Sequence, residues 1–414
     1  MNTTSINTGD TCWVLVSTAL VCLMTPGLAF FYGGMVRRKN VLSVLMQCFI
    51  LLCVISLQWI LFGYSLAFSP HGGPFIGNLQ WAGLKGVGLT PYPDYAATIP
   101  HQLYMAFQMM FAVITPALII GAFAERIKFS GFLLFTILWA TLIYDPIAHW
   151  VWGMGGWLHN MGALDFAGGT VVHINSGIAA LITALLLGKR DGYDNKPIPP
   201  HNIPFTAVGT AMLWFGWFGF NAGSALAANG TAVSAFITTN TAAAAAGLGW
   251  MLLEWFVNGT PTTLGVLTGA VAGLVAITPA AGYVSAMSAI YIGLIVSGVC
   301  FVFVSRIKPF FGYDDSLDTF GIHGVGGIVG ALATGLFAQK IINAAGGNGA
   351  FFGNPKLFTT QLIAVGATIL YTAVGTLILF KLSDFLVGVR VTRKEEHTGL
   401  DLGQHHESGY TILE

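Results

Sequence analysis

Long apolar stretches, separated by short polar connections, run along the chain from residue 12 to residue 387. A helix needs roughly 20 such residues to cross the hydrocarbon core of a bilayer. The alternation of polar and apolar residues that marks a transmembrane β-strand is absent, and a helix satisfies its own backbone polar groups in lipid. The pattern therefore predicts an all-α polytopic membrane protein with eleven transmembrane helices, at residues 12–35, 41–68, 102–124, 130–150, 169–188, 203–225, 233–257, 261–278, 284–304, 320–338 and 358–387.

The composition agrees with a membrane protein and excludes several soluble classes. Of the 414 residues, 55% are hydrophobic and 8% are charged, whereas a typical soluble domain has about 25% charged residues. So few charges cannot cover a soluble globule, which excludes a cytosolic enzyme, a nucleic-acid-binding protein and a disordered scaffold. The 53 glycines favour helices that pack closely through small residues.

Other features predict no metal, no cofactor and no catalysis. The five cysteines lie within or at the ends of apolar stretches without metal-like spacing, and we interpret them as small buried hydrophobic residues. The sequence has no P-loop and no nucleophile–base pattern, so we expect neither ATP-driven transport nor an enzyme. Residues 1–11 lack a basic segment, and we expect no cleavable signal peptide.

The basic residues predict the orientation. Only Lys85, Lys340 and Lys356 of the 17 lysines and arginines fall on one side of the predicted spans. The positive-inside rule then places the N-terminus outside and the C-terminus in the cytoplasm. The opposite, cytoplasmic side holds the remaining fourteen, Arg37, Arg38, Lys39, Arg126, Lys128, Lys189, Arg190, Lys196, Arg306, Lys308, Lys381, Arg390, Arg393 and Lys394.

Two similar segments indicate an internal duplication. Residues 170–178 and 320–328 both place a histidine before a Gly-rich stretch, and each follows an aspartate, Asp165 or Asp318. Five spans per copy would invert the second copy, as is common in transporters, where the pathway lies between the copies. We therefore predict a transmembrane domain at 1–388, with repeat one at about 12–188, repeat two at about 203–338 and a last helix at about 358–387, and then a cytoplasmic regulatory tail at 389–414.

His173 and His323 are the leading functional candidates because polar side chains inside a membrane are costly. Each lies a few residues inside its predicted span. They could be two unrelated core histidines bonded to backbone carbonyls, or the axial ligands of a haem, although no haem-attachment motif flanks them. Their matching places in the two copies favour a third interpretation, a pair that meets near the pseudo-symmetry axis.

Aromatic residues form a second set of candidates. Phe107 and Phe111 are four residues apart and share a helix face. Trp217, Phe220 and Ser224 also share one face, beside glycines at 216, 219 and 223. Such stripes commonly pack in a core, but a face with Trp, Phe and Ser next to glycines also suits the lining of a narrow passage.

Trp152 and Asp165 lie near the predicted outer boundary. Trp152 is either an interfacial anchor or an aromatic face for an incoming cation. Asp165 could cap the helix of His173 by accepting bonds from the N–H groups at 168–170, or tune the field that a cation feels, and the two roles are compatible. On the inner side, we expect Asp318 to cap the helix of His323. We expect solvated charges at Glu125, Arg126 and Lys128.

Along nearly its whole length the chain resembles the ammonium transporter (Amt/Mep/Rh) family. The resemblance implies eleven helices, an inverted 5+5 repeat and a homotrimer with one pore per subunit. The motifs that carry it are Pro-Gly at 26–27, Phe-Tyr-Gly-Gly-Met at 31–35, Arg-Lys-Asn-Val at 38–41, Ala-Glu-Arg-Ile at 124–127, the aspartate-to-asparagine stretch 165–175, the Gly-Trp-to-Ser stretch 216–224, Thr-Pro-Ala at 278–280 and the Phe-to-Val stretch 320–325.

The resemblance also implies roles for individual residues. It implies an external ammonium site at Trp152, Ser224, Phe107 and Phe111, a gate at Phe111 and Phe220, and pore histidines at His173 and His323. It implies supporting roles for Asp165, Trp217 and Thr278. The protein would then serve nitrogen uptake in the cell membrane, that is the plasma or inner membrane, with ammonium or ammonia as its substrate and the lipid bilayer around it.

The tail resembles the family's cytoplasmic tail, which takes part in control by PII-type signalling proteins. The matching residues are 399–401, His405, Glu407 and Tyr410. His406 stands where the family usually has glycine, and we expect a backbone conformation there that favours glycine.

Elementary energetics predict how such a pore would work. Moving an ammonium-sized ion into a medium of low dielectric costs of order 20 kcal/mol, whereas removing a proton whose pKa lies roughly two units above the ambient pH costs about 3 kcal/mol. We therefore expect deprotonation at the aromatic site, passage of ammonia between neutral histidines, and co-translocation of the proton. The alternatives are an ammonium sensor with little flux and a passive, Rh-like ammonia gas channel.

Overall fold

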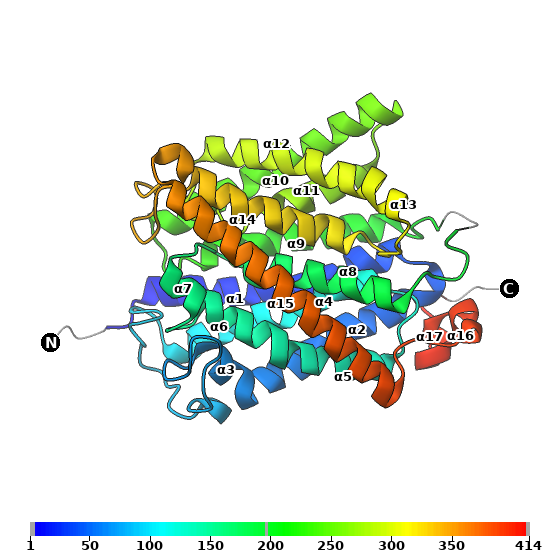
Figure 1. The fold of residues 1–414 in the computed structure, drawn as a ribbon, viewed down its shortest axis with the longest axis horizontal. Coiled ribbons are helices and arrows are strands. Elements are labelled where there is room, and N and C mark those ends of the chain that lie inside the picture. The colour runs from blue at the N-terminus through cyan, green and yellow to red at the C-terminus, as the bar shows by residue number, and fades with distance from the viewer. Residues whose placement is uncertain (1–4, 195–197, 411–414) are drawn as a thin grey trace.

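The computed structural model describes residues 5–194 and 198–410, which fold as one helical bundle (Figure 1). The prediction of an all-α protein is confirmed, because these residues form no β-strand beyond two isolated bridges. The first half contains α1 (Thr8–Met35), α2 (Val41–Gln58), α3 (Tyr64–Phe68), α4 (His101–Phe123), α5 (Phe129–Trp139), α6 (Asp145–Trp152), α7 (Trp157–Met161) and α8 (Asn175–Leu187). The second half contains α9 (Ile203–Gly223), α10 (Gly230–Asn258), α11 (Thr263–Ile277), α12 (Ala286–Val302), α13 (Lys308–Phe311), α14 (Val325–Phe337), α15 (Pro355–Val387), α16 (Arg393–Thr398) and α17 (Leu400–His405).

Each of the eleven predicted spans is helical in the described residues. Among the described residues, ten helices are long and apolar enough to cross a membrane, and α11, with 15 residues, is shorter. At 1.5 Å per residue α11 covers about 22 Å, so the predicted span 261–278 is helical but does not cross a full bilayer by itself. The helix α11 ends at Ile277, and Thr278 and Pro279 follow it.

Five π-helical turns interrupt the spans in the part of the chain that the structure describes, and two of them carry the candidate histidines. A π-turn at Gly169–Ile174 holds His173 and leads into α8, and another at Phe320–Gly324 holds His323 and leads into α14. Such turns are rare and occur often at functional sites. The other three lie at Trp59–Gly63, Ala140–Tyr144 and Phe303–Ile307.

Glycine lets the central helices approach closely, as the composition predicts. Gly216 and Gly219 of α9 pack on α1, where an added Cβ would lie 2.8 Å from the carbonyl oxygens of Leu20 and Ser17. Gly177 of α8 lies directly against the backbone of Gly324, which leaves no room for a Cβ on Gly177. This crossing brings the two histidine-bearing segments together.

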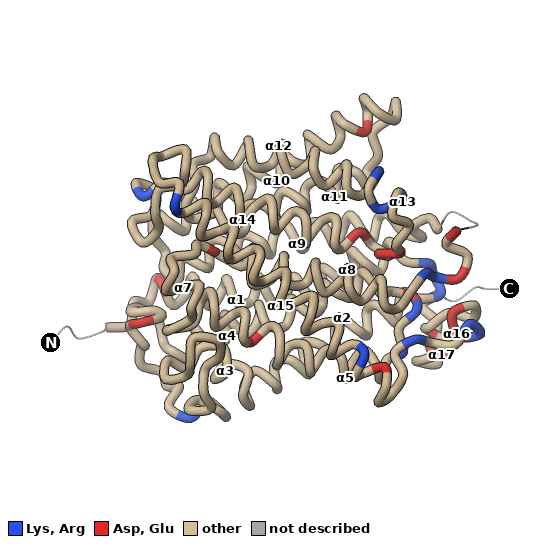
Figure 2. Tube along the Cα trace, in the orientation of Figure 1, with Lys and Arg blue, Asp and Glu red and all other residues tan. Residues whose placement is uncertain are grey.

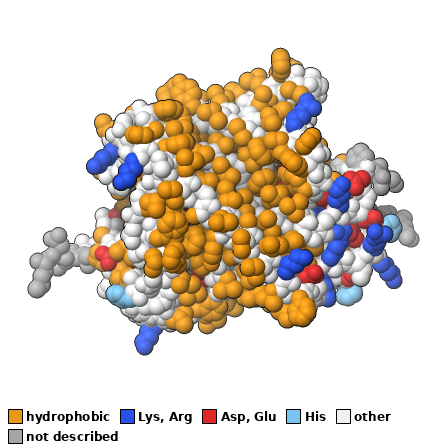
Figure 3. Space-filling model, viewed as in Figure 1, with side chains coloured by type: hydrophobic (Ala, Val, Ile, Leu, Met, Phe, Trp, Pro, Cys, Tyr) orange, Lys and Arg blue, Asp and Glu red, His pale blue; other side chains and the backbone are white. Residues whose placement is uncertain are grey.

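The surface has the apolar middle and the charged ends that a membrane-spanning protein needs. Apolar side chains cover the middle of the face seen in Figure 3, and charged side chains lie toward the ends of the bundle. Lysine and arginine concentrate at the end where α16 and α17 lie (Figure 2), in agreement with the predicted asymmetry. Lys196, one of the residues assigned to that side, lies outside the described residues.

The expectation of solvated charges at Glu125 and Arg126 is wrong. Their exposed fractions are 1% and 0%. Glu125 Oε2 lies 3.0 Å from Arg37 Nε and 3.1 Å from Arg190 Nη1, and Asp314 pairs with both Arg190 (2.8 Å) and Arg126 (3.2 Å). Burial alone would raise the pKa of Glu125, but the two arginines hold it below its ordinary value. Buried charges persist because partners from distant segments compensate them.

Lys128, the third residue of that set, is exposed as expected. Its Nζ donates to the carbonyl of Val387 (3.1 Å) at the C-terminal end of α15, where a cation complements the helix dipole.

The tail folds back onto the bundle. Asp401 of α17 accepts a hydrogen bond from the Ser43 backbone N–H (2.8 Å) at the start of α2, and Asn40 accepts one from the Leu400 N–H (2.8 Å). His406 has φ +56°, so the expected glycine-like conformation at this position is confirmed.

Candidate functional site

A cavity of about 630 Å³, here named the vestibule, lies at the end of the bundle where α7 is. Its wall includes Phe111, Trp152, Asp165 and Ser224, four of the predicted site residues. The Trp152 Nε1–H donates to the Asp165 carbonyl oxygen (2.8 Å), and the Trp152 ring stands at 90° to that of Phe111, 5.9 Å away. Trp152 is therefore fixed in orientation with part of its ring exposed in the cavity.

The rings of Phe111, which lines the vestibule, and Phe220 lie against each other. They lie 4.3 Å apart at an interplanar angle of 36°, and each is 1% exposed. The Ser224 hydroxyl donates to the carbonyl of Phe220 (2.8 Å), which leaves the lone pairs of its oxygen free. Phe107 packs on Phe111 at 5.0 Å but is absent from the residues that line the vestibule.

The capping interpretation of Asp165 is confirmed. Its Oδ1 accepts from the N–H groups of Gly168 and Gly169, each at 2.7 Å, and its Oδ2 accepts from those of Thr170 (2.7 Å) and Val171 (3.1 Å). One carboxylate thus satisfies four backbone donors at the start of the π-turn that carries His173.

The two histidines contact each other. Their Nδ1 atoms lie 3.2 Å apart, their rings are nearly parallel at 24°, and they are 1% and 3% exposed. A single proton is shared in this contact, so one Nδ1 donates and the other accepts. The core-histidine interpretation is wrong here because the rings bond to one another. The haem interpretation also fails, because the two ring centroids lie only 5.3 Å apart and leave no space for a macrocycle between the rings.

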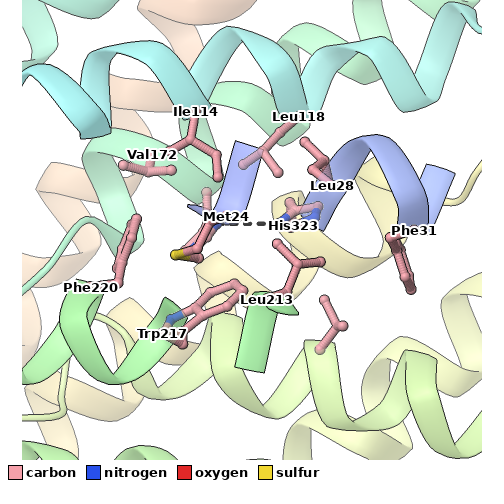
Figure 4. A pocket seen from close by; sticks show the side chains of 12 residues that line it. Met24, Leu28, Phe31, Ile114, Leu118, Val172, Leu213, Trp217, Phe220 and His323 are labelled. Carbon is pink, nitrogen blue, oxygen red and sulfur yellow. Dashed lines mark hydrogen bonds between the residues drawn. The ribbon is translucent and has the colours of Figure 1, made fainter. Parts of the chain in front are cut away.

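A second, central cavity lies beneath Phe220 and contains the histidine pair (Figure 4). Its volume is about 10 Å³, which is room for about one water-sized molecule. Apart from the imidazoles and the Trp217 indole its lining is apolar. The lining residues are Met24, Leu28, Phe31, Ile114, Leu118, Val172, His173, Leu213, Trp217, Phe220, Val271 and His323.

Trp217 and Thr278 support this cavity differently. The Trp217 ring stacks on His173 at 5.4 Å and 20°, so it is part of the wall. Thr278 accepts a hydrogen bond from the Trp217 Nε1–H (2.9 Å) and lies behind it. Leu213 and Met24 are two of the lining residues that were not predicted. Leu213 precedes Trp217 by four residues and shares its face, which is a signal that the sequence offered, whereas Met24 depends on the packing of α1 against α9.

Asp315 replaces Asp318 as the cap of the second histidine segment. Asp315 Oδ2 accepts from the Phe320 N–H (2.7 Å), whereas Asp318 has φ +59° and pairs with Lys308 at 2.6 Å. The expectation for Asp318 was wrong because its backbone turns the carboxylate toward the lysine. Asp165 and Asp315 are 150 residues apart, the same separation as His173 and His323.

The described residues hold no group of three or more His, Cys, Asp or Glu side chains that could bind a metal ion.

Comparison with known proteins gives the family. Residues 12–410 match the model of the Ammonium Transporter Family. The chain is 55% identical to the ammonium transporter of Bacillus subtilis (97% of this chain, 98% of that protein) and 50% identical to ammonium transporter Amt1 of Archaeoglobus fulgidus (97% and 99%). The crystal structure of Saccharomyces cerevisiae Mep2 superposes with a TM-score of 0.88 at 38% identity, covering 94% of this chain and 88% of that one. The chain therefore belongs to the ammonium transporter family and is a multi-pass protein of the cell membrane.

Proposed function

We propose that this protein recruits ammonium in the vestibule, removes its proton at the phenylalanine pair, and passes ammonia through the central cavity while the proton is co-translocated. The observation that carries the proposal is the closed, narrow and almost entirely apolar passage, whose polar groups are two imidazoles in contact (3.2 Å) and one indole.

Recruitment depends on the vestibule wall. Trp152, held by its bond to the Asp165 carbonyl, offers an aromatic face to a cation. The Ser224 hydroxyl donates a hydrogen bond to the Phe220 carbonyl. The lone pairs of its oxygen can therefore accept a hydrogen bond from an ammonium N–H. In this proposal Phe107 acts through Phe111, against which it packs, and does not touch the substrate.

The Phe111–Phe220 pair selects for a molecule that can lose its charge. Its rings leave no open path, and a cation entering the dry cavity would lose its hydration at a cost of order 20 kcal/mol in the idealised limit. Ammonium avoids most of this cost by giving up a proton. Potassium has no proton to release and no N–H to donate to Ser224, so the pair excludes it.

The histidine pair is suited to relay the released proton. The His173 Nε2 has no hydrogen-bond partner in the described part of the chain, and the Nδ1 atoms of the two rings are in contact. A proton accepted at Nε2 of His173 makes that ring cationic, its Nδ1 proton passes to the Nδ1 of His323, and His323 releases its Nε2 proton on the far side. The net result is one ammonia and one proton moved, which is net uptake of ammonium.

We further propose the orientation and assembly that the sequence and its resemblance imply. The N-terminus lies outside and residues 389–414 form a cytoplasmic regulatory tail, open to a PII-type partner. The protein is a homotrimer with one pore per subunit in the inner membrane, organised as an inverted 5+5 repeat. The equal spacing of the aspartate and histidine pairs supports the repeat.

Solid-supported-membrane electrophysiology on the purified protein tests the proposal. An ammonium jump should produce a transient inward current in proteoliposomes and an equal potassium jump should not. His173→Ala should abolish the ammonium current or admit potassium, and an unchanged current with unchanged selectivity would contradict the paired role.

A sensor with little flux is the second candidate. The solved structure titled "Sensor Amt Protein" superposes with a TM-score of 0.88 at 29% identity, covering 96% of this chain and 98% of that one, so the same fold is compatible with sensing. Ammonium-dependent change in the tail without current would favour it. Ammonia flux without current would favour the passive channel.

A further inference from the structure

The face of α4 in the vestibule wall differs from the one that the sequence singled out. Tyr104, Gln108 and Phe111 line the cavity, at positions i, i+4 and i+7 of the helix. Phe107, one residue before Gln108, is turned away from it and packs behind Phe111. A side-chain amide therefore lies in the wall one turn above the Phe111–Phe220 pair.

The hydrogen bonds of this amide are incomplete. Gln108 is 9% exposed, and its Nε2 donates to the Tyr104 hydroxyl at 3.5 Å. Its Oε1 is buried and has no hydrogen-bond partner within residues 5–194 and 198–410. An unpaired buried acceptor is unfavourable, and native proteins keep few of them without a functional reason.

Asp165 and Trp152, two other polar residues of the wall, already use their hydrogen-bonding groups. All four hydrogen-bond contacts of the Asp165 carboxylate go to backbone N–H groups, and Trp152 donates its only N–H to the Asp165 carbonyl. The Ser224 hydroxyl donates one hydrogen bond, and its oxygen keeps lone pairs that can accept another. Near the phenylalanine pair, Ser224 Oγ and Gln108 Oε1 thus stand out as acceptors with capacity for a ligand.

We propose that Gln108 Oε1 is a second hydrogen-bond acceptor for the ammonium ion, acting together with Ser224. This inference rests on the proposed function of the vestibule. An amide oxygen carries a strong partial negative charge, which suits a cation, and the bond to Tyr104 orients the amide. Ser224 and Gln108 would then accept hydrogen bonds from two of the four N–H groups of ammonium. Gln108 would therefore favour cations that have at least two N–H donors.

The test compares Gln108→Met and Gln108→Glu with the wild type in ammonium-jump currents. Methionine keeps the length but removes the acceptor, and it should raise the half-saturating ammonium concentration about tenfold, equivalent to about 1.4 kcal/mol. Glutamate keeps an acceptor and adds charge, so it should leave that concentration unchanged or lower it. Gln102→Met, on the same helix but exposed and bonded to Val87, is the matched control and should behave as wild type.

Three results would overturn the inference. One is an unchanged half-saturation in Gln108→Met, and another is an equal loss of maximal current in both variants, which indicates packing. If the wild type itself carries no current, the proposed transport fails separately. Ammonium-induced thermal stabilisation of wild type and Gln108→Met then still measures binding, and equal stabilisation of the two is the third result.

Discussion

Asp165→Asn separates the two roles that the sequence left open for this residue, a cap and a source of field. The carboxylate accepts four backbone hydrogen bonds at the start of the π-turn of His173. An asparagine keeps one oxygen and places an amide nitrogen where the other was. The two backbone N–H groups that had bonded to the replaced oxygen then face the amide N–H groups and lose their acceptor.

The structure gives the size of the effect. A hydrogen bond to a charged group contributes about 1.5–3 kcal/mol, so the loss of two such bonds costs at least about 3 kcal/mol. A change of this size lowers the midpoint of thermal unfolding by roughly 3–6 °C. Because the cap sets the π-turn, His173 also loses its alignment with His323, and the ammonium current should fall with the stability.

Asp94→Asn is the matched control. Asp94 is exposed in the same vestibule wall, so its substitution removes one negative charge from the cavity without touching the cap. Thermal unfolding in detergent and ammonium-jump currents in proteoliposomes are measured for both variants. The cap predicts a large loss in Asp165→Asn and a small change of apparent affinity in Asp94→Asn. Equal, salt-sensitive effects of the two substitutions, with no loss of thermal stability, would refute this reasoning.

Three further predictions follow from the geometry. Trp152→Leu should raise the half-saturating ammonium concentration in current measurements more than it lowers the maximal current, and an unaltered half-saturation would contradict the cation-binding face. Deletion of residues 399–414 removes the Asp401 contact to α2 and should loosen regulation while the pore still forms; loss of the trimer in native mass spectrometry would make the tail structural instead. Burial raises the pKa of Asp315 from 3.8 to about 6, opposed by Lys308. The folded state therefore binds the Asp315 proton more tightly than the unfolded state does. This difference contributes about 3 kcal/mol to the free energy of unfolding; the contribution is complete below pH 3.8 and is lost as the pH rises to about 6. Asp315→Asn should flatten this part of the stability profile in thermal unfolding, and an unchanged slope would exclude the assignment.

The apolar spans and the leading candidates could be predicted from the sequence because they depend on local properties. Hydrophobicity and length mark a membrane helix without knowledge of its neighbours, and all eleven predicted spans are helical in the described residues. A histidine inside such a span is conspicuous for the same reason, since it is costly wherever it lies. The cap by Asp165 was also accessible, because acceptor and donors are three to six residues apart.

The tertiary structure alone decided which polar groups meet across the bundle. Glu125 and Arg126 have the composition of a solvated loop, and they are buried because Arg37, Arg190 and Asp314 arrive from other segments. Helix periodicity cannot tell whether Phe107 or Gln108 faces the vestibule, since the rotation of α4 is set by its neighbours. The contact of His173 with His323 spans 150 residues and depends on two glycines at a helix crossing. Local sequence determines the cost of placing a group in the membrane, and only the packed structure supplies the partner that offsets that cost.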